Sequence, residues 1–198
     1  MGHVRDAYLF VSQWTGTFNG VALIAFAGVG SWLLMLFGPE YATQTTYVVL
    51  VILSTLYFFG TWVGPTGALL QMTNGHRVEL VNTIIFIVSN IGLNYLLIPA
   101  YGIIGAALAT FGSGLMRNII QLAEIGWFHS VSPLQPRNLA VLLLTVLMTA
   151  GGFFAGDPWI RLPITVIGMG VVAGLALYTA TKNERRAVLD LVLRRREA

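Results

Sequence analysis

Three polar side chains could line a path for a charged or sugar-bearing molecule inside an otherwise apolar stretch. Arg117, Gln121 and Glu124 are spaced four and three residues apart, which places them along one face of a helix. Arg117 lies about 21 Å along a helix that starts at Ile103, which is deep in a bilayer core about 30 Å thick. An arginine there costs at least about 2.5 kcal/mol, so it should face a cavity or a partner. We therefore expect either substrate contact or an internal ion pair.

A second polar stripe precedes the first one. Asn90 and Asn94 are one helical turn apart, and Glu79 and Asn82 fall in the same broad sector of that helix. Amides at this depth can bind sugar hydroxyls or hydrogen-bond to a neighbouring helix. Together with Arg117, the two asparagines predict a polar-lined path, with contacts between helices as the alternative for each of them.

A glycine and a proline interrupt another apolar stretch. Pro65 removes a helical hydrogen bond, so the helix is expected to bend there, and Gly64 beside it gives the backbone freedom. We treat Gly64 and Pro65 as hinge candidates, because bends of this kind serve as hinges in transporters, although many are static.

Catalytic constellations are not evident in the sequence. The three histidines, His3, His76 and His129, lack metal-ligand spacing, and the chain contains no cysteine. No Gly-rich phosphate loop or nucleophile elbow is present. We expect neither an enzyme nor a bound metal or cofactor.

The composition predicts an integral membrane protein. Hydrophobic residues make up 56% of the chain and charged residues only 10%, against about 25% charged in an average soluble domain. So few ionic groups cannot cover the surface of a water-soluble protein of this size. The composition excludes a soluble enzyme and a nucleic-acid-binding domain.

Charges and turn residues divide the chain into six apolar spans, which predicts an all-α bundle of six transmembrane helices. The spans lie within 7–37, 41–72, 78–98, 103–128, 139–155 and 159–181. Residues 1–181 would form one transmembrane domain, and residues 182–198 a basic tail. In this scheme Pro99 ends the third span, Gly102 allows the turn, and Gly105, Ala106 and Ala109 give the fourth span a closely packing face.

The distribution of basic residues predicts the orientation. Arg5, Arg77, Arg137 and six residues of the tail would lie on one side, which is nine of the 11 basic residues, and Arg161 alone on the other. Basic residues favour the cytoplasm, so we place both termini inside a plasma or inner membrane. The tail is expected to lie near anionic lipid or to be a solvated anchor.

The first span has a polar first half. Its five polar side chains, Ser12, Gln13, Thr15, Thr17 and Asn19, interrupt the apolar run that a signal peptide requires. We therefore interpret it as a membrane span whose polar face meets protein or water.

Two segments resemble one transporter family. The segment 90–110 reads NIGLNYLLIPAYGIIGAALAT, and 36–42 reads LFGPEYA. The first closely resembles the C-terminal half of the polysaccharide transporter (Wzx-like) branch of the MOP flippase superfamily, and the second resembles a loop at the equivalent place. The two segments also have the separation that this family shows.

The resemblance implies a function. Proteins of that family move lipid-linked oligosaccharides across the membrane by alternating access between two helical lobes, and cationic cavity residues are thought to meet the lipid phosphate. It implies Arg117 as the candidate for this role. Fourteen helices are usual in the family, and these six look like the last six. The N-terminal lobe would then belong to a longer product or to a second chain.

Two other functions stay open from the residues alone. One is a multidrug or ion-coupled exporter of the same superfamily. The other is a membrane subunit that does not transport and that scaffolds polysaccharide enzymes through its basic tail.

Overall fold

The computed structural model describes residues 2–72, 75–129, 136–155 and 158–180, and these residues form helices and turns with no strand. The helices are α1 (Gly2–Met35), the short 3₁₀ helix η1 (Pro39–Tyr41), α2 (Gln44–Val63), α3 (Thr66–Met72), α4 (His76–His129), α5 (Pro136–Phe154) and α6 (Pro158–Thr179). The predicted all-α fold is confirmed. The basic tail 182–198 lies outside the described residues.

Local sequence signals explain where several helices begin. The Thr43 side chain accepts a hydrogen bond from the Thr46 amide at 3.2 Å and so caps the start of α2. Pro136 and Pro158 occupy the first positions of α5 and α6, where a missing N–H costs nothing.

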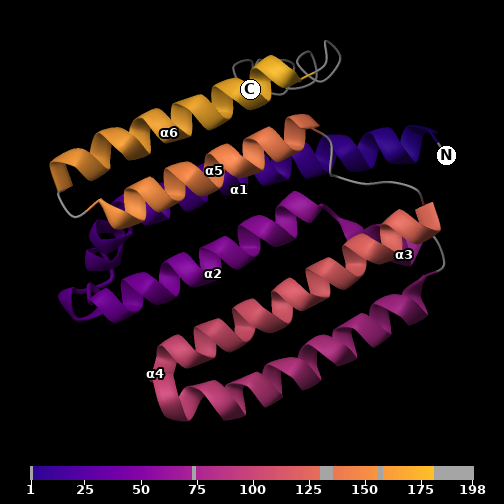
Figure 1. Cartoon of the computed structure of the whole chain (residues 1–198), viewed down its shortest axis with the longest axis horizontal. Coiled ribbons are helices and arrows are strands. Elements are labelled where there is room, and N and C mark those ends of the chain that lie inside the picture. Colours follow the sequence, from indigo (N-terminus) through magenta and orange to yellow (C-terminus); the bar gives the residue numbers. More distant parts are fainter. Residues whose placement is uncertain (1, 73–74, 130–135, 156–157, 181–198) are drawn as a thin grey trace, which may run out of the picture.

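Helix α4 is bent back on itself at Gly102. The backbone there has φ 57° and ψ −133°, which interrupts the helix and suits glycine because it has no Cβ. Figure 1 shows the two arms, 76–101 and 103–129, running back alongside each other. The predicted turn at Gly102 is confirmed.

The prediction that Pro99 ends the third span was wrong. The helix continues through Pro99, and the reversal comes three residues later. The missing N–H of Pro99 leaves only one carbonyl of the preceding turn without its helical partner, close to the end of the arm. The close packing predicted after the turn is present, because Ala109 is fully buried and a Cβ on Gly105 would overlap the Leu97 carbonyl.

The long rods alternate in direction along the chain (Figure 1). The start of α1, the α3–α4 junction, the end of α4 and the end of α6 lie at one end of the bundle, and η1, the turn within α4 and the start of α6 lie at the other. Helices cover the apolar stretches predicted from the sequence, but the predicted count of six transmembrane helices is not confirmed.

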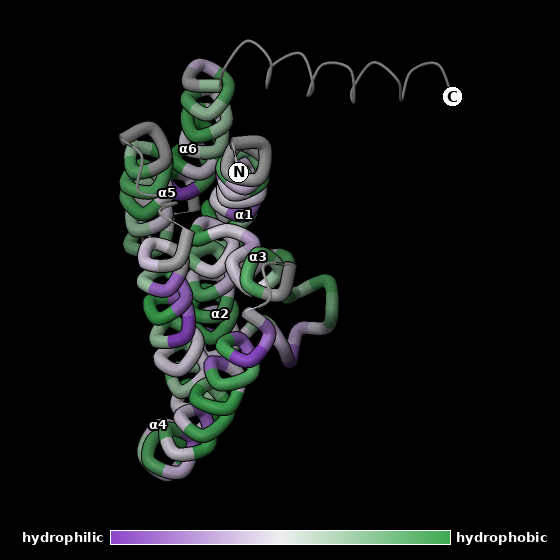
Figure 2. The backbone as a smooth tube through the Cα atoms, turned by 90° about the vertical axis from the view of Figure 1, so that its right-hand side faces the viewer, coloured by the Kyte–Doolittle hydropathy of each residue, from purple (hydrophilic) through white to green (hydrophobic). Residues whose placement is uncertain are grey.

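The helices pack in layers around α1 and α2. Helix α1 contacts α2, α5 and α6, while α4 packs against α2 and α3; Figure 2 shows this stack from the side. One core cluster joins Ile24 of α1 to Val141 of α5 and to Val172 and Ala176 of α6. The hairpin of α4 is thus held on one side of the bundle.

The polar half of α1 faces protein. Ser12, Gln13 and Thr17 are all buried, and the Gln13 amide donates a hydrogen bond to the Ala176 carbonyl of α6 at 3.4 Å. The prediction that this face meets protein or water is confirmed for these side chains.

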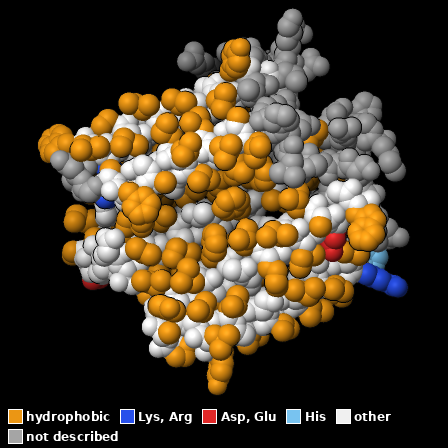
Figure 3. Space-filling view, viewed as in Figure 1, with side chains coloured by type: hydrophobic (Ala, Val, Ile, Leu, Met, Phe, Trp, Pro, Cys, Tyr) orange, Lys and Arg blue, Asp and Glu red, His pale blue; other side chains and the backbone are white. Residues whose placement is uncertain are grey.

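Four helical segments of the described chain are long and apolar enough to cross a membrane: Tyr8–Met35, Gln44–Leu70, His76–Glu124 and Trp159–Tyr178. The third is the bent helix α4, and the apolar part of α5, Leu139–Phe154, is shorter. Figure 3 shows hydrophobic side chains over most of the visible face, with charged ones toward the ends of the rods. Exposed Ile84, Ile87 and Ile91 on α4 belong to this surface, which soluble proteins rarely present.

Candidate functional site

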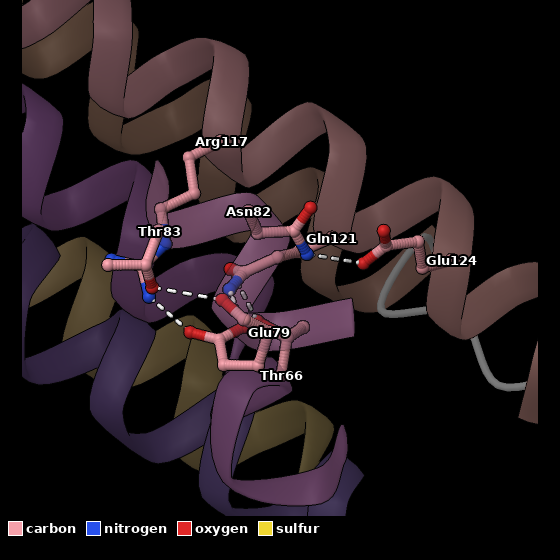
Figure 4. A network of polar contacts seen from close by, with 7 residues as sticks. All are labelled: Thr66, Glu79, Asn82, Thr83, Arg117, Gln121 and Glu124. Carbon is pink, nitrogen blue, oxygen red and sulfur yellow. Dashed lines mark hydrogen bonds and ion pairs between the residues drawn. The ribbon is translucent and has the colours of Figure 1, made fainter. Parts of the chain in front are cut away.

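The polar face of the second arm of α4 packs against the first arm. The Arg117 guanidinium forms an ion pair with the Glu79 carboxylate, and the Gln121 amide donates to the other Glu79 oxygen at 2.8 Å. Figure 4 shows these side chains converging from the two arms. The predicted alignment of Arg117 and Gln121 on one helix face is confirmed, and Glu79 is their shared partner.

Two further contacts extend this cluster. The Thr66 hydroxyl of α3 donates to the Gln121 carbonyl oxygen at 2.9 Å, and the Asn82 amide donates to the Glu124 carboxylate at 2.6 Å. Glu79 and Asn82 are buried, so both depend on these partners. The network therefore connects α3 to both arms of α4.

The two asparagines lie farther along the same seam. The Asn90 amide donates to the Ser113 hydroxyl at 3.1 Å and to the Thr110 hydroxyl at 3.4 Å. The Asn94 amide donates to the Asn90 side-chain oxygen at 2.9 Å. The Asn90 contacts join the two arms, which is the alternative considered for that residue, whereas Asn94 bonds to Asn90 within its own arm.

A cavity of about 330 Å³ lies between α2 and α4. Its lining consists of four residues of α2 and five of α4: Leu56, Tyr57, Gly60, Thr61, Phe86, Thr110, Gly114, Arg117 and Asn118. Among the described residues that line it, Arg117 is the only charged one, and about a third of the Arg117 side chain is exposed. The cavity thus contains one cation among hydroxyl, amide and aromatic groups.

Arg117 has capacity left for another acceptor. Its Nε is buried and has no hydrogen-bond partner among the described residues. The guanidinium carbon lies 5.9 Å from the centre of the Phe86 ring, which helps to hold the side chain in place. A guanidinium with free donors recognises phosphate and carboxylate groups.

A second cavity, of about 340 Å³, is almost wholly apolar. It lies between α2, α4 and α5, and residues such as Ile52, Phe59, Phe111 and Phe153 line it. None of the described residues that line it is charged. The Arg117 cavity is therefore the better candidate for binding a polar group.

The chain breaks its helix at the predicted bend. Helix α2 ends at Val63, Gly64 has φ 95° and ψ −173°, and α3 starts at Thr66. The Tyr8 hydroxyl of α1 donates to the Val63 carbonyl that the break leaves free. The bend is confirmed, while movement about Gly64 and Pro65 stays a prediction.

The sequence indicated part of this site and missed the rest. It singled out Arg117, Gln121 and Glu124, which the structure brings together, and Asn90 and Asn94, which lie apart on the same seam. Tyr57, Thr61 and Asn118 on the cavity wall were not singled out. Asn118 could have been recognised as a candidate, because it follows Arg117 directly in the sequence. Nothing in the sequence pairs α2 with the second arm of α4.

Comparison of this chain with protein-family models, with curated proteins and with solved structures finds no match. Among the described residues, no group of three or more His, Asp or Glu side chains could hold a metal ion.

Proposed function

We propose that this chain is part of a membrane flippase that moves lipid-linked oligosaccharide precursors for cell-surface polysaccharide. The resemblance of segments 36–42 and 90–110 to Wzx-like transporters supports the proposal. The observation that carries it is Arg117 on the wall of the cavity between α2 and α4. A cation in an apolar surrounding favours an anionic headgroup, such as a lipid phosphate.

The neighbouring groups suit the sugar part of such a substrate. Thr61, Thr110 and Asn118 line the same cavity as Arg117, and hydroxyl and amide groups can both donate to and accept from sugar hydroxyls. The apolar helix surfaces around the cavity suit a lipid carrier.

We propose six spans with both termini in the cytoplasm. Each arm of α4 is long enough to cross a core about 30 Å thick, and α5, with 19 residues, is about 28 Å long. The proposal also includes the N-terminal lobe of the family, contributed by a longer product or a second chain, because alternating access needs two lobes.

Transport in membrane vesicles tests this function. The vesicles are prepared from cells that produce the chain, so that any second chain is retained. They are then supplied with a fluorescent polyprenyl-phosphate-linked sugar or with a cationic dye. We expect the sugar lipid to change leaflet, with a loss of at least about tenfold in rate in the Arg117→Gln variant. Arg77→Gln, the same substitution at an exposed arginine of the first arm of α4, is the matched control.

The other results favour the alternatives. Export of the cationic dye without movement of the sugar lipid would support a multidrug exporter. The scaffold subunit would be supported by two results together. Neither the sugar lipid nor the dye moves although the chain is folded, and deletion of the tail releases polysaccharide enzymes from the membrane.

A further inference from the structure

We infer that Glu79 competes with the anionic group of a bound molecule for Arg117, so that ligand binding requires the Glu79–Arg117 pair to open. This inference rests on the proposed function, because it concerns the same cavity. It assigns Glu79 the role of a built-in competitor that sets how tightly, and how reversibly, an anion binds.

The first support is the position of Arg117 between two environments. On one side its Nη2 pairs with the buried Glu79 carboxylate, and on the other the side chain lines the cavity. Its Nε is buried and has no partner among the described residues, so it becomes available to an anion only when the side chain moves. The Arg117 side chain therefore lies between the Glu79 carboxylate and a cavity that can hold the anionic group of a bound molecule.

The second support is the charge balance. The Glu79–Arg117 pair is neutral, and the remaining cavity lining carries no formal charge. Glu124 belongs to the same cluster, but its carboxylate is bonded to Asn82, and His76 and Arg77 on the same arm are exposed. The Glu79 carboxylate thus neutralises the Arg117 charge to which an anionic ligand would bind.

The third support is the connection from Glu79 to the helix break. Gln121 holds the second Glu79 oxygen and accepts from Thr66 of α3, two residues after Gly64. Moving Glu79 away from Arg117 disturbs the contact that ties α3 to α4. Binding in the cavity would therefore loosen α3 at the break, which gives the hinge candidates a physical link to the ligand.

Binding of dodecyl phosphate, a simple phosphate amphiphile, tests the competition. The full chain is placed in phosphatidylcholine nanodiscs, and binding is followed by calorimetry with the heat of empty nanodiscs subtracted. We expect Glu79→Gln to tighten binding at least about tenfold, because the amide keeps the shape and removes the competing charge. Glu40→Gln, the same substitution at an exposed position near η1, is the matched control and should stay within about twofold of the unsubstituted chain.

Arg117→Gln separates this inference from the proposed function. If Arg117→Gln abolishes saturable binding and Glu79→Gln binds no tighter than the unsubstituted chain, the competition is overturned while the phosphate site stands. If Arg117→Gln binds dodecyl phosphate normally, the phosphate role of Arg117, and with it the proposed function, is overturned. Gel filtration shows which variants remain folded.

A second variant tests the inference if the Glu79→Gln chain does not fold. Glu79→Asp keeps the charge but shortens the side chain by one methylene, which draws the carboxylate away from the guanidinium. We expect it to tighten binding by about threefold, because the competition weakens without disappearing. Unchanged or weaker binding by a folded Glu79→Asp chain would contradict the inference.

Discussion

The Glu79→Leu chain is expected to lose about 2–4 kcal/mol of folding free energy, because the substitution leaves the Arg117 charge without its partner. The expected loss is smaller than for a fully buried ion pair, because about a third of the Arg117 side chain is exposed to solvent. The same substitution also removes the acceptor of the Gln121 amide. Unfolding in mixed dodecyl maltoside and dodecyl sulfate micelles measures the loss.

A double substitution distinguishes the lost charge pair from lost packing. Replacing Arg117 by Met in the Glu79→Leu chain removes the orphaned charge, so at least about 1 kcal/mol of stability should return, although the Gln121 amide still lacks its acceptor. Glu40→Leu, at an exposed position near η1, is the control and should change stability by less than about 0.5 kcal/mol. Equal losses in the single and double variants would contradict the ion-pair account.

The Gly64→Ala chain is expected to lose about 3 kcal/mol. The φ of 95° and ψ of −173° at Gly64 fall in a region that is essentially restricted to glycine, which costs about 1–3 kcal/mol for other residues. A Cβ there would also overlap the Ser12 hydroxyl, and Ser12 is buried. The same micelle unfolding experiment measures the loss.

Gly60→Ala is the matched control for this prediction. Gly60 lies in α2 one turn earlier, and a Cβ there would approach only the Asn118 side chain, at 3.4 Å. Alanine favours a helix over glycine by about 1 kcal/mol, so Gly60→Ala should be neutral or stabilising. If both substitutions destabilise the chain equally, the special backbone at Gly64 is not the cause.

Much of the fold was predictable because apolar length and turn chemistry act locally. The all-α fold, the reversal at Gly102 and the break at Pro65 all correspond to features of the structure, while the count of six transmembrane helices is not confirmed. Pro99 was misjudged because a proline near a helix end removes only one hydrogen bond and can remain helical. The reversal stayed at Gly102, and only the end of the helix before it differed from the prediction.

The sequence allowed us to predict which site residues share a helix face, but not which residues contact each other between helices. Spacing placed Arg117, Gln121 and Glu124 on one face, since helical periodicity fixes the face of every residue. It could not show that Glu79 pairs with Arg117, because that contact depends on the register of the two arms. The cavity was likewise invisible, since α2 and the second arm of α4 meet only in the folded chain.

Photolabelling with a phosphate amphiphile tests the central claim most directly, that Arg117 in the α2–α4 cavity binds an anionic lipid headgroup. The amphiphile has a photoreactive group next to its phosphate, and the labelled peptides of the chain in nanodiscs are identified by mass spectrometry. We predict labelling of Tyr57–Thr61 and Thr110–Asn118, reduced at least about fivefold by Arg117→Gln. Labels spread over the exposed face of α4, and insensitive to that substitution, would contradict the claim.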